Sequence, residues 1–121
     1  MNKRILVVED QADNRRILRD LLTSAGYEII EAENGQEALE VVARERPNLI
    51  LMDIQLPLLD GYEVTRRIKA DPALRSIPII AITSYALSGD ESKAKAAGCD
   101  AYVAKPFSPR ALLAKIREYV P

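Results

Sequence analysis

Short apolar runs alternate with segments of helical periodicity along the whole chain, and this alternation is the feature that most limits its fold. The apolar runs predict strands at residues 5–8, 27–32, 48–53, 77–83 and 100–104. Apolar spacing and capping residues predict helices near 13–25, after Asn34, after Asp60, at 88–97 and after Ser108. Repeated strand–helix units predict an α/β fold: a five-stranded parallel sheet with right-handed crossovers and helices on both faces.

The third predicted strand indicates how the layers are arranged. Residues 49–52 (Leu-Ile-Leu-Met) are apolar at successive positions, whereas a half-exposed strand would alternate. This pattern is typical of a strand buried on both faces, in the middle of a doubly wound sheet. Two strand orders are common in such sheets, and periodicity does not choose between them. In both orders, ligands bind at the carboxyl ends of the strands, near the point where the strand order reverses.

The composition excludes several classes of function. The chain has 121 residues, with 17 Lys and Arg against 18 Asp and Glu, a net charge of −1, no histidine and one cysteine. This length predicts a single domain over residues 1–121, with no output domain in this chain. A charge near zero argues against a nucleic-acid binder that works through a basic face. Without histidine, the chain cannot form a Ser-His-Asp triad, bind zinc through imidazole or carry its own phosphohistidine.

The apolar segments are too short for membrane insertion or export. A membrane helix needs about 20 apolar residues, and the first apolar run already ends at Glu9, too early for a signal-peptide core. Cys99 alone cannot form a disulfide within the chain, which fits a reducing compartment. We therefore expect a soluble, cytoplasmic protein.

Polar residues stand where the predicted strands end. The first strand is followed by Glu9 and Asp10, the third ends at Asp53, the fourth ends at Thr83 and Ser84, and Lys105 follows the fifth. Because the carboxyl ends of parallel strands meet at one edge of a sheet, we expect these side chains to gather there. The sequence therefore predicts a polar site with three carboxylates and one ammonium group.

Three crowded carboxylates repel one another, since two unit charges about 4 Å apart interact by about 4 kcal/mol at an effective dielectric constant near 20. Either their pKa values rise or a cation binds among them. Oxygen ligands without histidine or cysteine select hard cations, and an open site with few carboxylates suits Mg²⁺, with Mn²⁺ or Ca²⁺ as substitutes. In such a site, Asp53 could attack a phosphoryl group and form an aspartyl phosphate. Lys105 and the metal would neutralise charge, and Thr83 would donate a hydrogen bond.

Five segments, in order and each at the expected end of a strand, resemble the receiver domain of two-component response regulators. They are Ile5–Asp10, Leu51–Pro57 with Asp60-Gly61, Ile79–Ser84, Gly98–Tyr102 and Lys105–Phe107. Each segment alone is a weak signal, but together they are highly specific and span essentially the whole chain. The resemblance implies the flavodoxin-like strand order 2-1-3-4-5.

The resemblance also assigns roles to residues. It implies that Asp53 is the phosphoacceptor, and that Glu9, Asp10 and the backbone carbonyl of Gln55 join Asp53 in binding Mg²⁺. Lys105 would pair with the phosphoryl group. The peptide bond from Lys105 to the proline that follows it is cis in most receivers.

The function implied is a phosphorylation-dependent switch rather than an enzyme beyond weak assisted autophosphorylation and autodephosphorylation. A sensor histidine kinase or histidine-phosphotransfer protein would donate the phosphoryl group. Thr83 and Tyr102 would relay the change to a surface around the fourth helix, fifth strand and fifth helix, where an unknown protein target binds. No direct contact with nucleic acid and no membrane insertion are expected. Gln55 and Tyr85 occupy positions that influence how water reaches the acyl phosphate.

Three other functions are compatible with parts of the pattern. A phosphatase of the haloacid dehalogenase type also uses an aspartate after an apolar strand, but it requires a second aspartate where Gln55 stands. A flavin- or nucleotide-binding module needs a glycine-containing phosphate loop, whereas residues 9–13 are acidic and lack glycine. A degenerate receiver that only binds proteins would not need the full acidic set. Separately, the basic helix face with Arg15 and Arg19 is either solvated or contacts the phosphodonor.

Overall fold

The computed structural model describes residues 3–83 and 90–121. Over these residues, the strands are β1 (Arg4–Val8), β2 (Glu28–Ala32), β3 (Leu49–Asp53), β4 (Ile79–Thr83) and β5 (Ala101–Ala104). The helices are α1 (Ala12–Ser24), α2 (Gly35–Glu45), α3 (Gly61–Ala70), α4 (Asp90–Ala97) and α5 (Pro109–Tyr119). All strand pairs are parallel, in the order β2-β1-β3-β4-β5. The predicted fold class and strand order are confirmed.

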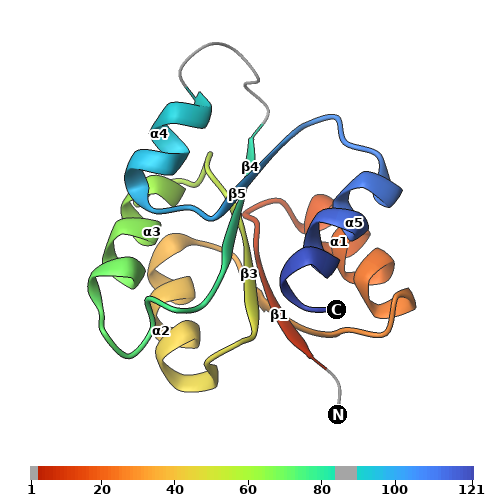
Figure 1. Cartoon of the computed structure of the whole chain (residues 1–121), viewed down its shortest axis with the longest axis horizontal. Coiled ribbons are helices and arrows are strands. Elements are labelled where there is room, and N and C mark those ends of the chain that lie inside the picture. Colours follow the sequence, from red (N-terminus) through yellow and green to blue (C-terminus); the bar gives the residue numbers. More distant parts are fainter. Residues whose placement is uncertain (1–2, 84–89) are drawn as a thin grey trace.

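Helices cover both faces of the sheet. In Figure 1 the sheet is seen nearly edge-on, with α2, α3 and α4 on the left and α1 and α5 on the right. Alternate side chains of β3 feed the two cores: Ile50 and Met52 pack with the first group of helices, and Leu49 and Leu51 with the second. Each of these side chains is almost fully buried, which contributes about 1.5–3 kcal/mol per residue. This double burial explains the continuous apolar run in the sequence.

Capping residues fix where three helices begin. The side chains of Asn34, Asp60 and Ser108 accept hydrogen bonds from backbone amides in the first turns of α2, α3 and α5. Each cap satisfies an amide that has no partner within its own helix. The predicted start signals of these helices are therefore confirmed.

Some strands begin one or two residues later than the apolar runs suggest. The clearest case is Ile77, which was expected to open the fourth strand. Its amide donates instead to the carbonyl of Leu74 in the preceding turn, and the strand begins after Pro78, which has no amide to donate. Three residues of the sequence interpretation, Ser84, Tyr85 and the expected helix start at Ser88, lie outside the described residues.

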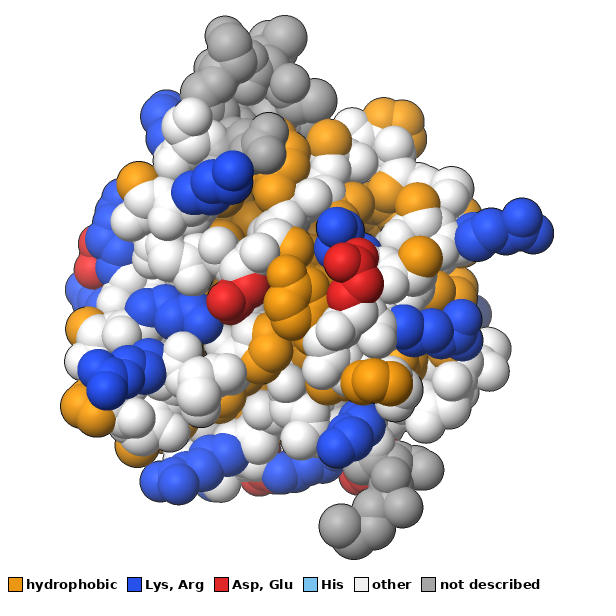
Figure 2. All heavy atoms as spheres, viewed as in Figure 1, with side chains coloured by type: hydrophobic (Ala, Val, Ile, Leu, Met, Phe, Trp, Pro, Cys, Tyr) orange, Lys and Arg blue, Asp and Glu red, His pale blue; other side chains and the backbone are white. Residues whose placement is uncertain are grey.

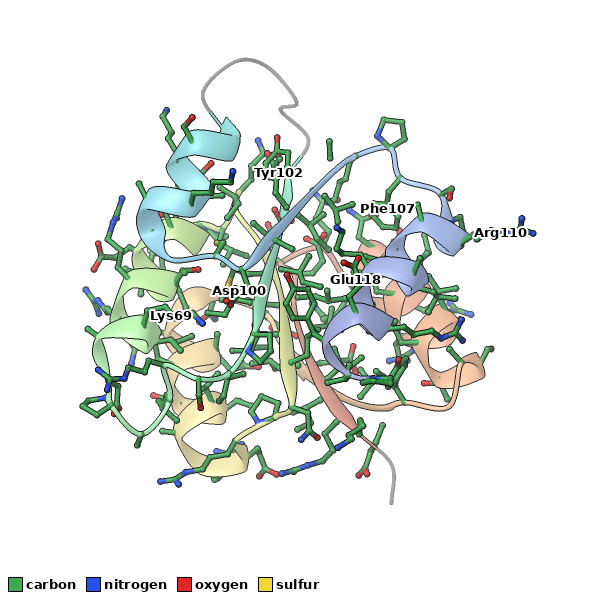
Figure 3. All side chains as sticks on the ribbon, in the orientation of Figure 1. Lys69, Asp100, Tyr102, Phe107, Arg110 and Glu118 are labelled. Atoms are coloured by element: carbon green, nitrogen blue, oxygen red, sulfur yellow. The ribbon has the colours of Figure 1, made fainter. Side chains whose placement is uncertain are left out.

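A lysine clamp joins segments at the edge of the sheet opposite the strand carboxyl ends. Lys69 Nζ donates to the carbonyls of Arg75 and Ile77 and lies 2.9 Å from Asp100 Oδ2. The same carboxylate oxygen accepts from the amide of Ile79. In Figure 3 the side chains of Lys69 and Asp100 point toward one another between α3 and β5. The clamp fastens the start of β4 to the segment that leads into β5.

Among the described residues, no helix combines the length and the apolar character needed to cross a membrane.

Candidate functional site

The acidic side chains come from the carboxyl ends of two adjacent central strands. Val8 pairs with Met52 across β1 and β3, so Glu9 and Asp53 are the next residues on neighbouring strands. The strand order reverses at this pair, and such a reversal point is where open α/β sheets bind ligands. One carboxylate oxygen from each of Glu9, Asp10 and Asp53 lies within 4.8 Å of the other two. The structure thus brings the three predicted acids together.

These three acids differ sharply in burial. Glu9 is 2% exposed and Asp53 is 6% exposed, whereas Asp10 lies on the surface. Burying a carboxylate costs stability unless it is paired or hydrogen-bonded. Lys105 supplies this compensation, because its Nζ lies 3.2 Å from Glu9 Oε1 and 3.5 Å from Asp53 Oδ2. The ammonium group therefore bridges the two buried carboxylates.

Backbone amides complete the pairing of the buried carboxylates. The amide of Gln11 donates to Glu9 Oε2 at 3.2 Å, and the amide of Gln55 donates to Asp53 Oδ1 at 2.9 Å. Both bonds are to an acid two residues earlier, which ties each side chain to its own loop. These hydrogen bonds hold the Glu9 and Asp53 carboxylates at the lining of the surface pocket.

The site nevertheless lacks positive charge. Among residues 3–83 and 90–121, three carboxylates gather around one ammonium group, which leaves this cluster with a net charge of about −2. Partial desolvation, followed by a hydrogen bond and repulsion from Glu9, raises the pKa of Asp10 above its usual range. A raised carboxyl pKa indicates that the site favours additional positive charge at Asp10, either a proton or a cation.

A divalent cation fits this arrangement. The three acids open onto a surface pocket of about 220 Å³. Its lining residues are Glu9, Asp10, Gln11, Asn14, Asp53, Gln55 and Lys105. The side chains that line this pocket carry carboxylates, amides and one ammonium group. Mg²⁺ prefers carboxylate oxygens as ligands and keeps several water molecules. The residues present therefore suit Mg²⁺ better than zinc, which favours nitrogen and sulfur ligands.

Thr83 lies at the end of the strand next to Asp53. Asp53 pairs with Ile82 across β3 and β4, and Thr83 is the following residue. The Thr83 side chain is fully buried, and its backbone carbonyl accepts from the amide of Lys105 at 2.7 Å. The Lys105–Pro106 peptide bond is cis, as the resemblance implies. Thr83 and Lys105, both predicted for this edge, are thus joined by a backbone hydrogen bond.

Tyr102 lies farther from the acids, on the outer strand. It pairs with Ala81 across β4 and β5, two residues before Ala104, which pairs with Thr83. Because side chains alternate along a strand, Tyr102 and Thr83 project from the same face of the sheet. Tyr102 is half-buried and packs against the core beneath α3 and α4, and it lines a separate pocket of about 210 Å³. It does not line the acidic pocket.

Arg15, named in the sequence analysis as part of a basic helix face, makes contacts at the site that the sequence did not indicate. Its guanidinium group donates to the backbone carbonyl of Glu9 at 2.9 Å and forms ion pairs with Glu31 and Glu33. With a side chain only 14% exposed, Arg15 is mostly engaged in contacts within the chain rather than solvated. Arg19 is likewise paired with Glu31. The pairing of β2 with β1 brings these glutamates close to α1. Local sequence patterns therefore could not predict their ion pairs with Arg15 and Arg19.

An apolar groove lies beside the acidic pocket. It has a volume of about 490 Å³ and runs between α1 and the segment that joins β5 to α5. Glu9 and Lys105 line its inner end, and Ile17, Leu18 and Phe107 are among its apolar walls. Ile17 is 62% exposed despite its hydrophobic side chain. The groove therefore offers apolar contact area directly next to the charged site.

Asp10→Asn is expected to raise the melting temperature of the metal-free protein at neutral pH, because the folded state disfavours the charged form of this carboxyl. The folded pKa lies above the unfolded one. The higher melting temperature of Asp10→Asn should therefore be seen above the raised pKa of Asp10 in the folded protein. It should disappear as the pH falls below the pKa of Asp10 in the unfolded chain. Thermal unfolding from pH 7 to pH 3, with and without Mg²⁺, measures it.

The same Asp10→Asn variant should lose most of the stabilisation that Mg²⁺ gives the wild type, since a ligand oxygen has lost its charge. Asp20→Asn is the matched control, because this aspartate is 70% exposed on the outer side of α1. If Asp10→Asn melts at the wild-type temperature in the absence of metal, then the folded state does not disfavour the charged form of Asp10.

Comparison with known proteins gives one consistent family. The model of the response regulator receiver domain matches residues 5–117. The polar-differentiation response regulator DivK of Brucella anthropi is 46% identical over 120 residues, 99% of this chain and 98% of that protein. DivK of Brucella ovis is 44% identical over the same coverage.

Solved structures agree. The receiver domain of a sensor histidine kinase from Pseudomonas aeruginosa, determined with a magnesium ion coordinated in its active-site cleft, is 38% identical with a TM-score of 0.92. The match covers 99% of this chain and 98% of the chain from Pseudomonas aeruginosa. The chemotaxis protein CheY4 of Vibrio cholerae is 27% identical, with a TM-score of 0.92 over 98% of this chain and 99% of that one. With this sheet order, this acidic cluster and these relatives, the chain belongs to the response-regulator receiver domain family of two-component signalling.

Proposed function

We propose that the protein is a phosphorylation-dependent switch in which Asp53 accepts a phosphoryl group from a phosphohistidine on a partner protein. The observation that carries the proposal is the buried pair Glu9 and Asp53, bridged by Lys105 and completed by Asp10 at the point where the strand order reverses. A fold gains nothing in stability by crowding three acids around one ammonium group. Their position at a ligand-binding edge supports a chemical role.

In the transfer step, a carboxylate oxygen of Asp53 forms a bond to phosphorus. The bond from phosphorus to the ring nitrogen of the donor histidine breaks, and its electron pair stays with the ring. Asp53 Oδ1 is held by the amide of Gln55, which orients the carboxylate. Lys105, 3.5 Å from Oδ2, is placed to stabilise charge on the phosphoryl oxygens.

Glu9, Asp10, Asp53 and the backbone carbonyl of Gln55 would hold Mg²⁺. The ion, when bound, supplies charge that offsets the repulsion between the acids and an anionic phosphoryl group. The pocket of about 220 Å³ leaves space for this group and for water. The magnesium ion in the related receiver from Pseudomonas aeruginosa supports this assignment.

The phosphorylated state would be read at the surface formed by α4, β5 and α5. Thr83 and Tyr102 lie on the same sheet face, one at the acidic edge and the other at the outer strand. A change in the position of Thr83 would alter the packing of Tyr102 and bias this surface between two arrangements.

This surface offers features that a protein target could recognise. Figure 2 shows two acidic side chains on either side of a hydrophobic ridge, and Figure 3, in the same orientation, labels acids at these places as Asp100 and Glu118. A pocket of about 210 Å³ lies between α4, β5 and α5. The side chain of Lys115 pairs with that of Glu118 at its rim. The target would be a protein rather than nucleic acid or membrane.

The donor would be a sensor histidine kinase or a histidine-phosphotransfer protein, in the cytoplasm. The apolar groove beside the acidic pocket supports docking of the donor over α1. Arg15 and Arg19 on the same helix remain candidate charged contacts, and the exposed Ile17 adds an apolar one.

The proposal is tested by incubating the protein with acetyl phosphate and Mg²⁺ and measuring intact mass. The wild type should gain the mass of one phosphoryl group, as the acetyl–phosphate bond breaks and acetate leaves. Asp53→Asn should gain none, and chelation of the metal should strongly reduce the gain. Asp13→Asn, which removes a carboxylate outside the cluster, is the matched control and should react like the wild type. A wild type that never gains mass, or an Asp53→Asn variant that still does, would overturn the proposal.

A further inference from the structure

The loop between β1 and α1 carries two of the three acids, and a hydrogen bond from Arg15 fixes its backbone. The amide of Glu9 donates to the carbonyl of Ala32 at 3.1 Å, and the carbonyl of Glu9 accepts from Arg15 Nη1 at 2.9 Å. The peptide group that joins Glu9 to Asp10 is planar, so the direction of this carbonyl determines where the Cα of Asp10 lies. Arg15 therefore acts on the position of Asp10 through the backbone.

The start of α1 differs from the starts of the other capped helices. The N-caps of α2, α3 and α5 each accept a backbone hydrogen bond with their side chain, whereas the N-cap of α1, Gln11, does not. A side-chain cap ties the residue before a helix to its first turn. In α1 a tie of this kind is made from within the helix, by Arg15, back to Glu9.

Two glutamates fix the guanidinium group of Arg15 in turn. Its Nε lies 3.3 Å from Glu31 Oε1 and its Nη2 lies 3.3 Å from Glu33 Oε1, while Nη1 donates to the Glu9 carbonyl. Each nitrogen of the planar group thus has its own acceptor, a geometry that a lysine with one nitrogen cannot reproduce. Arg15 therefore fastens the acidic loop to the end of β2 and to the residue that follows it.

Pairing with the glutamates does not by itself account for the contact with the loop. Arg19, further along α1, pairs with the same Glu31 at 3.3 Å, and its side chain is 45% exposed. Its other ion pair is with its neighbour Asp20. Arg19 thus neutralises the same glutamate as Arg15, but the bond to Glu9 comes from Arg15, so the two residues form a natural comparison.

We propose that Arg15 is a positioning residue for the divalent cation at the acidic site. The inference rests on the proposed function, since it concerns the Mg²⁺ that would assist phosphorylation of Asp53. By fixing the peptide between Glu9 and Asp10, Arg15 keeps carboxylate oxygens of these acids and of Asp53 within 4.8 Å of one another. Removing a group that orients metal ligands typically lowers metal affinity by about tenfold to hundredfold.

The charge of Arg15 allows this effect to be distinguished from simple electrostatics. A guanidinium group near the acids repels a divalent cation, so the loss of its charge alone would strengthen Mg²⁺ binding. The loss of the constraint on the loop would weaken Mg²⁺ binding, because the ion must then order the ligands itself. The two effects have opposite signs, and we expect weaker binding.

The experiment measures the melting temperatures of the wild type, R15Q, R15K and the control R19Q during a titration with Mg²⁺, without a phosphodonor. The Mg²⁺ dissociation constant follows from the stabilisation. R15Q should raise this constant by about tenfold or more. R15K keeps the charge but only one donor nitrogen, so its constant should lie between those of the wild type and R15Q. R19Q loses an exposed pair and leaves the bond to Glu9 in place, so its constant should stay within about twofold of the wild type.

A double-mutant cycle tests whether Arg15 acts through Asp10. In the Asp10→Asn background, R15Q should change the Mg²⁺ dissociation constant by less than about threefold, because the ligand that Arg15 positions is already impaired. With acetyl phosphate, R15Q should need about tenfold or more Mg²⁺ for half-maximal labelling. At saturating Mg²⁺ its labelling rate should come within about twofold of the wild type.

The inference is overturned if R15Q binds Mg²⁺ as tightly as the wild type or more tightly, or if its labelling rate stays low at saturating Mg²⁺. An equal effect of R15Q with and without Asp10→Asn also overturns it. If R15Q does not fold, the comparison is made with R15K, and an unchanged Mg²⁺ affinity of R15K then decides against the inference. A wild type that acetyl phosphate never labels contradicts the proposed function, whereas a labelled wild type and an unchanged R15Q contradict only the role of Arg15.

Discussion

Lys105→Met is expected to lower the free energy of unfolding of the metal-free protein by about 2–3 kcal/mol at neutral pH. The substitution removes the ammonium group from Glu9 and Asp53, which are 2% and 6% exposed. Breaking a fully buried ion pair costs about 3–5 kcal/mol, and the Lys105 side chain is 23% exposed, so the expected loss is smaller. Urea unfolding in the presence of a chelator measures it.

Magnesium should restore more stability to Lys105→Met than to the wild type. Without the ammonium group, the described part of the chain offers these carboxylates no cationic partner, so a bound ion replaces it and raises the unfolding free energy according to its affinity. Labelling by acetyl phosphate should nevertheless fall by about a hundredfold, because a positioned donor to the phosphoryl oxygens is lost. The variant would thus distinguish two roles of Lys105: neutralising the buried acids before transfer and stabilising charge on the phosphoryl group during transfer.

Lys115→Met is the matched control for this variant. Lys115 pairs with Glu118 on the surface, where the two side chains are 39% and 60% exposed. Its removal should change stability by no more than about 0.5 kcal/mol, with no response to magnesium beyond that of the wild type. If Lys105→Met is as stable as the wild type without metal, then Lys105 does not offset the burial of the two acids.

Gly61→Ala is expected to destabilise the protein by about 3 kcal/mol or more. A Cβ at this position would lie 2.5 Å from the carbonyl oxygen of Asp53 and 2.8 Å from the Cα of Ile54. Both are backbone atoms next to the acidic site, so no side-chain rotation relieves the overlap. The loop must shift, and the shift would displace Asp53 and reduce labelling by acetyl phosphate.

Gly26→Ala separates this steric effect from backbone strain. Gly26 has φ +96, and an added Cβ would meet nothing within 4 Å. It should cost about 1–2 kcal/mol through its conformation and leave labelling unchanged. Thermal unfolding and labelling rates of both variants test the comparison, and a Gly61→Ala variant that labels at the wild-type rate would show that the loop shifts without moving Asp53.

Most of the elements and the members of the candidate site could be predicted from sequence because their signals are local. Helical apolar spacing, the capping side chains of Asn34, Asp60 and Ser108, and continuous apolar strands each depend on a few neighbouring residues. Strand boundaries were less certain where a turn competes for the same amides, as at Ile77. The polar strand ends converged as expected, because parallel strands leave their carboxyl ends at one edge.

The alternation of strands and helices and the types of residue at the acidic edge follow from local sequence patterns. The differences in burial and pairing between these residues follow from the tertiary fold. Glu9 is buried while its neighbour Asp10 is exposed, and Arg15 is held by Glu31 across the β1–β2 pairing. Leu58 is strained and fully exposed within an otherwise packed loop. Burial and pairing depend on contacts between segments distant in the chain, and such contacts leave no periodic or local mark in the sequence.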